Sequence, residues 1–309
     1  MNPQGMGSDP EWGQTRNVPI LNASGCLDAL AAPEVAGTLD AFVTKTVTPL
    51  PREGNPPPRF VETEGGMLNS IGLQNPGIDA FLSDHLPRLA QLGVPVWVSV
   101  GGFSAHECAE LCSSLDECEE IAVLELNLSC PNVEEAPETA AELVAAARKS
   151  TGKALYAKLS PATWDIAETA RAVADAGADG LSLVNTIRGL ALDGSSLRPI
   201  IARGTGGYSG PALRPVALAC VYACANVVEL PIVGMGGVAS GRDALALVAA
   251  GASAVALGTV LFSDPFAATR IRTELAEDAA ALGYASAGAT RRIALALAPP
   301  AHLSSLQTT

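Results

Sequence analysis

Residues 125–132 read Glu125-Leu126-Asn127-Leu128-Ser129-Cys130-Pro131-Asn132, and this stretch is the key to both the fold and the site. It follows an apolar run at 121–124 that is typical of a buried strand, and it sets a cysteine between two asparagines where that strand ends. A thiol can accept a proton from a bound substrate if it is partly ionised or passes its own proton to water. The amides of Asn127 and Asn132 offer donors and acceptors that suit a planar, amide-like ring. The structural alternative is a small apolar cysteine that closes a strand.

Short apolar runs of this kind recur along the chain and alternate with helical segments. Eight strands are predicted, at 18–23, 41–46, 95–100, 122–127, 154–159, 180–184, 232–234 and 254–257. Helices are predicted between them, at 78–92, 104–115, 138–150, 164–176, 211–225 and 241–250. No proline- or serine-rich linker interrupts the alternation, which predicts one α/β domain folded as a (β/α)8 TIM barrel.

Three segments fall outside this alternation. Residues 1–17 are polar and glycine-rich, so we expect a flexible or atypical tail before a barrel at 18–309. The proline-rich excursion at 49–66 is predicted to form a loop or hairpin inserted at the C-terminal face of the barrel, and 204–210 a glycine-rich loop. The tail has no basic and apolar signal-peptide pattern, and no apolar run is long enough to cross a bilayer. We therefore expect a cytoplasmic protein.

Composition narrows the possible partners. The net charge of −13 and the pI near 4.6 argue against nucleic acid or an anionic membrane as a partner. Hydrophobic residues make up 48% of the chain but aromatic residues only 4%, so a large core must consist of Ala, Val, Leu and Ile. An acidic surface still permits an anionic small ligand if the pocket itself holds lysines.

The cysteines argue for a reducing compartment. There are seven, an odd number, and no CxxC pair occurs. A metal or iron–sulfur site is the alternative, because several cysteines lie close in sequence, namely Cys108, Cys112, Cys118, Cys220 and Cys224. Their spacings match no usual ligand pattern, so reduced and mostly buried thiols are expected, and no metal site is predicted.

The ends of the predicted strands carry polar side chains. In a barrel of this kind the carboxyl ends of the strands form the active-site face. The residues there are Ser24, Lys45, Ser99, Asn127, Lys158 and Asn185. One lysine alone is more often a surface residue with an extended stem, and a buried one is costly without an anionic partner. Two lysines with several amides instead predict a polar site that binds an anion.

Two glycine turns suggest what the anion is. Residues 234–237 follow the seventh strand and Gly258-Thr259 the eighth, where barrels often seat a phosphate on backbone N–H groups. Residues 234–239 also fit the G-x-G-x-x-A dinucleotide pattern, but the next strand, at 254–257, ends without the acidic residue that a Rossmann site needs. A mononucleotide with its ring against Lys158 fits better, because a cation there would stabilise a reduced, anionic flavin.

With these residues in place, the chain resembles the class 1 dihydroorotate dehydrogenases from about Val18 to Asp264. The resemblance rests on eight motifs: Asn22-Ala23-Ser24-Gly25, 55–59, 67–77, 127–133, Lys158-Leu159-Ser160-Pro161, Val184-Asn185-Thr186, 206–212 and 234–238. Segment 67–77 looks more like class 1B than the fumarate-using class 1A. The resemblance implies an FMN-containing barrel that oxidises (S)-dihydroorotate to orotate in de novo pyrimidine biosynthesis.

The resemblance also implies roles for individual residues. Cys130, a cysteine in class 1 and a serine in class 2, would take the C5 proton while hydride passes from C6 to the flavin. The substrate would be held by Lys45, Asn69, Ser70, Ile71, Gly72, Leu73, Asn127, Asn132, Asn185 and Thr186. FMN would contact Ser24, Lys45, Thr46, Ser99, Asn127, Lys158, Val184, Gly210, Gly236, Gly237, Gly258 and Thr259. Class 1B enzymes pair with an electron-transfer subunit that carries FAD and a [2Fe–2S] cluster and reduces NAD⁺, so a homodimer or heterotetramer is implied.

The chain departs from the family pattern at three places. Residues 1–17 do not resemble the usual N-terminal hairpin, Ser99 replaces the usual asparagine, and the loop after Asn132 is shorter than usual, although relatives use that loop as a lid. Two other functions remain open: a dihydropyrimidine dehydrogenase-like enzyme, and a non-catalytic flavin-binding barrel. Lys45 and the asparagines favour a carboxylated pyrimidine, and retention of Cys130 favours catalysis.

Overall fold

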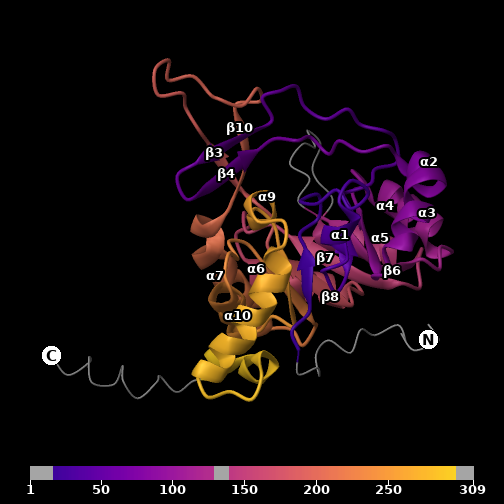
Figure 1. Ribbon diagram of the computed structural model, residues 1–309. Coiled ribbons are helices and arrows are strands. Elements are labelled where there is room, and N and C mark those ends of the chain that lie inside the picture. Colours follow the sequence, from indigo (N-terminus) through magenta and orange to yellow (C-terminus); the bar gives the residue numbers. More distant parts are fainter. Residues whose placement is uncertain (1–16, 129–138, 297–309) are drawn as a thin grey trace.

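A parallel sheet of eight strands, curled into a barrel, forms the centre of the computed structural model, which describes residues 17–128 and 139–296 (Figure 1). The order around the sheet is β1 (Ile20–Asn22), β12 (Ala254–Leu257), β11 (Ile232–Met235), β8 (Gly180–Leu183), β7 (Ala154–Leu159), β6 (Ile121–Asn127), β5 (Val96–Val100) and β2 (Phe42–Val43). Each of these strands lies inside a predicted strand or extends beyond it by no more than two residues, so the barrel prediction is confirmed. The predicted tail at 1–17 lies outside the described residues except for Asn17.

The barrel closes between β1 and β2. Leu21 and Ala41 form a parallel bridge there, and the side chain of Asn22 completes the join. Its amide nitrogen donates to the carbonyl of Val43 and its oxygen accepts from the N–H of Val43, both at 2.8 Å. Asn22 is fully buried, so a side chain supplies the backbone pairing that two short strands lack.

Alternation along the strands divides the core into two layers. Inward-facing side chains such as Val43, Trp97, Tyr156 and Met235 form one cluster inside the barrel, where the rings of Trp97 and Tyr156 lie with their centroids 4.7 Å apart. Outward-facing residues pack beneath the helices in a second, larger cluster. Every second residue of a strand points the same way, so short apolar runs serve both layers.

Within the described part of the chain, six longer helices surround the barrel: α4 (Ala105–Asp116), α5 (Ala140–Arg148), α6 (Ile166–Asp175), α7 (Arg214–Ala225), α8 (Gly241–Ala250) and α10 (Ala267–Ala281). Short helices follow β1 and β12, namely α1 (Pro33–Ala36) and α9 (Val260–Ser263). Ser104 caps α4, Asp165 caps α6 and Ser240 caps α8, each by accepting a hydrogen bond from a backbone N–H of the first turn. The predicted helix at 78–92 is broken into α2 (Ile78–Ala80), a π-helical turn (Phe81–His85), α3 (Leu86–Leu89) and a 3-10 turn (Ala90–Leu92).

A second, antiparallel sheet is inserted beside the barrel, in the order β3 (Phe60–Thr63), β4 (Gly66–Asn69), β10 (Thr205–Ser209) and β9 (Ile187–Leu190) (Figure 1). The predicted hairpin at 49–66 therefore extends into a four-stranded sheet. The prediction of a loop at 204–210 is wrong, because β10 pairs with both β4 and β9. Its glycines are required by packing: a Cβ on Gly206 would collide with the carbonyl of Asn69, and one on Gly207 with the hydroxyl of Thr186.

The cysteines of α4 and α7 belong to the core. Cys108, Cys112, Cys220 and Cys224 are all buried there. Burial raises the pKa of Cys112 and of Cys224 to about 12, so these thiols stay protonated at neutral pH. Among the described residues, no helix has both the length and the apolar character that crossing a bilayer requires.

We predict that Asn22→Leu lowers the free energy of unfolding by about 3 kcal/mol, because the N–H and C=O of Val43 would be left buried without partners. Asn226→Ala is the matched control, since that amide is exposed and bonds only to the carbonyl of Tyr222 at the end of α7. Urea unfolding of both variants measures the effect. Equal shifts of the two midpoints would contradict the assigned role of Asn22 in closing the barrel.

Candidate active site

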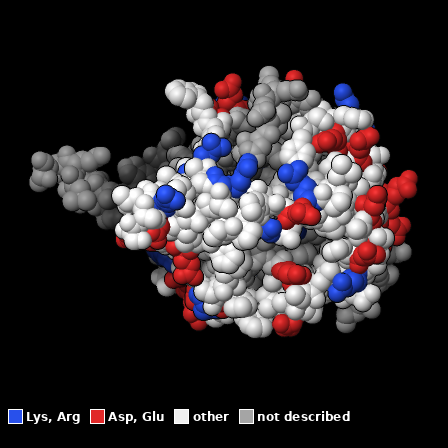
Figure 2. Space-filling model, turned by 90° about the horizontal axis from the view of Figure 1, so that it is seen from above, with Lys and Arg blue, Asp and Glu red and all other residues white. Residues whose placement is uncertain are grey.

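The carboxyl ends of the barrel strands meet at one face, on the side of the inserted sheet. Seen from above, that side of the molecule carries Lys and Arg side chains gathered near its middle, whereas most Asp and Glu side chains lie toward its edge (Figure 2). The chain as a whole has a net charge of −13, so this local excess of positive charge is a feature of the face and not of the protein. It suits an anionic ligand.

Lys158 is the last inward-facing residue of β7 and is only 3% exposed. Its Nζ donates to the hydroxyl of Ser24 at 3.0 Å and lies 3.5 Å from a carboxylate oxygen of Glu125. The sequence predicted that a buried lysine here would need an anionic partner, but Glu125 was not identified as that partner. The signal was present, since Glu125 interrupts an apolar strand two residues before Asn127 and therefore faces the same side.

A chain of polar side chains crosses the face from one strand end to the next. The hydroxyls of Ser99 and Thr46 lie 3.0 Å apart, and the amide of Asn127 donates to Thr46 at 3.2 Å. The amide of Asn185 then donates to the oxygen of Asn127 at 3.2 Å, while its own oxygen accepts from the backbone N–H of Thr186. The structure thus brings together five predicted site residues from four separate parts of the sequence.

Segment 70–73 lies beside this network, after β4. The amide of Asn55 donates to the carbonyl and the hydroxyl of Ser70, at 3.1 and 2.9 Å. Gly72 and Leu73 both have left-handed backbone conformations, with φ of 78° and 55°. Asn69 donates to the carbonyl of Gly207 at 3.3 Å, which ties the start of this segment to β10. These contacts hold the segment in one conformation. Asn55 makes two of them, although it was not predicted as a site residue.

Lys45 lies at the rim of the site, next to Gly25, and is exposed. Partial desolvation lowers the pKa of its ammonium, and the positive charge of Arg59 lowers it further, while Asp28 and Cys26 act in the opposite direction. Burial raises the pKa of the Cys26 thiol against the opposing effect of Lys158 and Lys45. Arg59, Asp28 and Cys26 are thus neighbours of the site that were not predicted to belong to it.

Two glycines form the turn at the carboxyl end of β11. Gly236 and Gly237 have φ of 115° and 80°, values that other residues rarely adopt. A Cβ on Gly237 would stand 2.8 Å from the backbone nitrogen of Arg214 and 2.9 Å from the carbonyl of Gly210, so the turn lies directly against the start of α7. Val184 packs beside Gly236.

The last strand end completes this part of the face. The hydroxyl of Thr259 donates to that of Ser209 at 2.8 Å, which joins the loop after β12 to the end of β10. Gly258 lies close to Ala23 and Cys26. Two predicted residues, Cys130 and Asn132, lie outside the described residues, as does the shortened loop that follows them.

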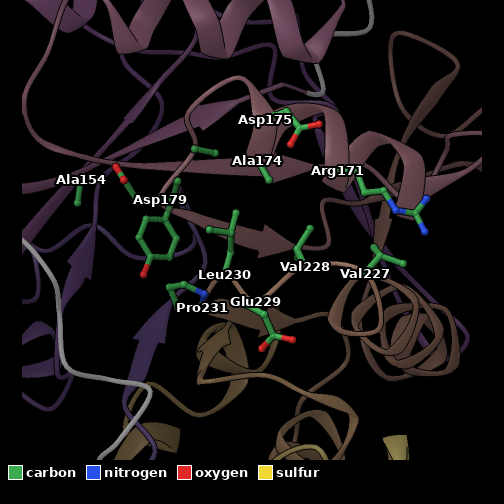
Figure 3. Close-up of a pocket in the computed structure, with 12 residues that line it drawn as sticks. Ala154, Arg171, Ala174, Asp175, Asp179, Val227, Val228, Glu229, Leu230 and Pro231 are labelled. Carbon is green, nitrogen blue, oxygen red and sulfur yellow. The ribbon is translucent and has the colours of Figure 1, made fainter.

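A cavity of about 810 Å³ lies at the opposite end of the barrel, near the amino ends of β7, β8 and β11. It is lined by aliphatic side chains together with charged ones that include Arg171, Asp175 and Glu229 (Figure 3). None of the predicted site residues lines it. Since catalysis in (β/α)8 barrels occurs at the carboxyl ends of the strands, this cavity is not the candidate site.

Comparison with known proteins places this geometry in a family. The family model for dihydroorotate dehydrogenase matches residues 11–278. The chain is 47% identical over 265 residues to the "Dihydroorotate dehydrogenase B (NAD(+)), catalytic subunit" of Pelobacter propionicus, covering 82% of this chain and 86% of that protein. The identically named protein of Trichlorobacter lovleyi is 49% identical over 240 residues, which cover 75% and 79% of the two chains.

The solved structures agree on the fold. A crystal structure of a dihydroorotate dehydrogenase from Eimeria tenella in complex with ferulenol superimposes with a TM-score of 0.74 at 23% identity, covering 90% of this chain and 85% of that one. At this level of identity the likeness shows only that the two proteins share a fold. The family model and the close relatives each cover most of the chain, and so the protein belongs to the dihydroorotate dehydrogenase family, among the class 1B catalytic subunits.

Proposed function

We propose that this chain is the catalytic subunit that oxidises (S)-dihydroorotate to orotate in pyrimidine biosynthesis, with FMN as its cofactor. The observation that carries the proposal is the arrangement of Lys158. Its ammonium is buried near a strand end, bonded to Ser24, and lies on the same face as the glycine turn at 236–237 and the amide network around Asn127. A flavin and a carboxylated pyrimidine that bind side by side require a cation, a phosphate-binding turn and a set of amides.

The residues present fit FMN. A phosphate needs a hollow without side chains, lined by backbone N–H groups and hydroxyls. Gly236 and Gly237, which have no side chains, form the turn after β11, and Ser209 and Thr259 place two bonded hydroxyls on neighbouring segments. Ser24 and Lys158 would hold the ring, and the other predicted contacts are Lys45, Thr46, Ser99, Asn127, Val184, Gly210, Gly236 and Gly258. FMN, when bound, supplies the hydride acceptor.

The polar network suits dihydroorotate, an anion with a cyclic imide. Asn127 and Asn185 are bonded to each other, which fixes the orientation of both amides on the side where the imide is proposed to bind. Lys45 supplies a positive charge at the rim for the carboxylate. The other residues proposed to hold the substrate are Asn69, Ser70, Ile71, Gly72, Leu73, Asn132 and Thr186.

Cys130 is proposed as the base that removes the proton from C5. Its thiolate form is the acceptor, and closeness to the proton matters as much as the pKa of the thiol. The buried thiols of Cys112 and Cys224, whose pKa values are raised to about 12, cannot serve at neutral pH. In the sequence, Cys130 follows the end of a predicted strand and stands between Asn127 and Asn132, whereas the other two cysteines lie in predicted helices.

The proposal includes a partner. Relatives of this chain are named as catalytic subunits of an NAD(+) enzyme. We therefore propose an electron-transfer subunit with FAD and a [2Fe–2S] cluster, in a heterotetramer around a homodimer of this chain. A cytoplasmic location, the separation of a tail at 1–17 from a barrel at 18–309, and the lack of a nucleic-acid or membrane partner stay predictions.

Anaerobic addition of dihydroorotate to the FMN-loaded protein should bleach the yellow flavin absorption. Parallel additions of dihydrouracil and dihydrothymine serve as controls and should leave it unchanged, because neither carries a carboxylate for Lys45. Bleaching by these two compounds but not by dihydroorotate would indicate a dihydropyrimidine dehydrogenase instead. A protein that takes up no FMN would contradict the proposal as a whole.

Cys130→Ser should slow flavin reduction at pH 7 by about 100-fold or more, because a serine hydroxyl is far less acidic than a thiol and general bases typically contribute 10²–10⁴-fold. Part of the loss should be regained as the pH rises. Cys118→Ser is the control, since Cys118 is half-buried in the turn between α4 and the amino end of β6, away from the site. Stopped-flow reduction by dihydroorotate measures both, and a parent-like rate for Cys130→Ser would rule out this base.

Gly237→Val should weaken FMN binding by at least about 100-fold, because the new side chain would collide with the backbone of Arg214 and Gly210 and distort the turn proposed to bind the phosphate. Gly152→Val is the control, since a Cβ there meets nothing within 4 Å and the residue lies on the amino side of β7. Fluorescence titration of apoprotein with FMN measures the affinity. If riboflavin, which lacks the phosphate, lost affinity as strongly as FMN, the phosphate assignment would be wrong.

A further inference from the structure

Glu125 stands out among the acidic residues of the chain. Within residues 17–128 and 139–296 it is the one fully buried carboxylate, 1% exposed, and Lys158 is the one fully buried lysine. A buried ion pair does not by itself increase stability, since apolar residues of similar volume usually serve as well or better. A pair kept inside the barrel, directly below the proposed flavin site, therefore calls for a chemical explanation.

The register shows how the pair is arranged. Glu125 lies beside Tyr156 in the β6–β7 pairing, whereas Lys158 lies beside Asn127, one inward-facing layer nearer to the carboxyl ends. The ammonium of Lys158 is thus placed between a carboxylate deeper in the barrel and the hydroxyl of Ser24 in the loop after β1. Its shorter bond, 3.0 Å against 3.5 Å, goes to Ser24 on the side of the site.

We propose that Glu125 is a positioning residue for the flavin: it orients the ammonium of Lys158 toward the ring and offsets part of its positive charge, which keeps the reduction potential of bound FMN lower than Lys158 alone would set it. The proposal rests on the function proposed above and adds that Glu125 lowers the reduction potential of the bound flavin. A cation near the ring favours the reduced, anionic form, and a carboxylate 3.5 Å from that cation opposes it in an interior where charges are weakly screened.

The arrangement has a consequence for catalysis. Electrons must enter the flavin from dihydroorotate and leave it for the partner, so a ring that holds electrons too strongly would slow their departure. Glu125 never needs to touch the substrate for this role. It acts through Lys158, and through the field that the pair creates at the ring.

The test compares the FMN-loaded parent with Glu125→Gln, which keeps the shape of the side chain and removes its charge. Dye equilibration measures the midpoint potential, and titration with sulfite, which adds to the oxidised ring and leaves it negatively charged, measures the same field independently. Glu125→Gln should bind sulfite about tenfold more tightly. Its potential should shift to more positive values by the equivalent of a tenfold change in a two-electron equilibrium, about 30 mV.

Ser182→Ala is the matched control. Ser182 is buried beside Lys158 on the neighbouring strand β8, so its loss perturbs the same layer without changing a charge. The equilibrium constants for flavin reduction and for sulfite binding should both stay within twofold of the parent. If Glu125→Gln does not accumulate as folded protein, Glu125→Asp replaces it. Its carboxylate is one methylene shorter and reaches Lys158 less closely, so sulfite should bind about threefold more tightly.

Two results separate this inference from the proposed function. A parent protein that takes up no FMN overturns both. A parent that binds FMN and is bleached by dihydroorotate, while the Glu125 variants keep the parent's potential and sulfite affinity or shift them in the opposite direction, overturns the role of Glu125 alone.

Discussion

Closure of eight parallel strands into one barrel is the constraint on which the rest of the structure depends. All of these strands run in the same direction, so the residues that follow them meet at a single face although they are far apart in sequence. Ser24 and Lys158 are separated by 134 positions and still share a hydrogen bond. Asn22 holds the join between the first two strands. It lies just before Ser24 in sequence and its partner Val43 just before Lys45, so the closure and the site depend on the same short segments.

The barrel interior changes character along its axis. Its deeper part is filled by apolar side chains, including Trp97 and Tyr156, which exclude water and fix the strands. Glu125 lies level with Tyr156, and Lys158 lies one inward-facing layer nearer to the carboxyl ends, level with Asn127 and the amides and hydroxyls bonded to it. A low-dielectric floor strengthens the field of any charge placed on it. The apolar packing that stabilises the fold is therefore also what gives one lysine and one glutamate influence over a bound ring.

The sequence predicted those parts of this arrangement that depend on local pattern. Eight apolar runs gave the strands, and the polar residues that end them were expected at one face because the barrel topology leaves no other place for them. β10 was missed because its glycine-rich sequence has low strand propensity, and only pairing with β4 and β9 makes it a strand. The spacing of Glu125 from Asn127 showed which side of the strand it faces, but its pairing with Lys158 depends on the register of β6 against β7, which a single sequence does not reveal.

The account depends most on the position of the ligands at the carboxyl ends of the strands. A crystal structure of the FMN-loaded protein with orotate tests this directly. Density for the flavin ring against Lys158, for its phosphate against Gly236 and Gly237, and for orotate beside Asn127 and Asn185 is the predicted result. Density for either ligand in the cavity at the opposite end, near Tyr156 and Glu229, would contradict it.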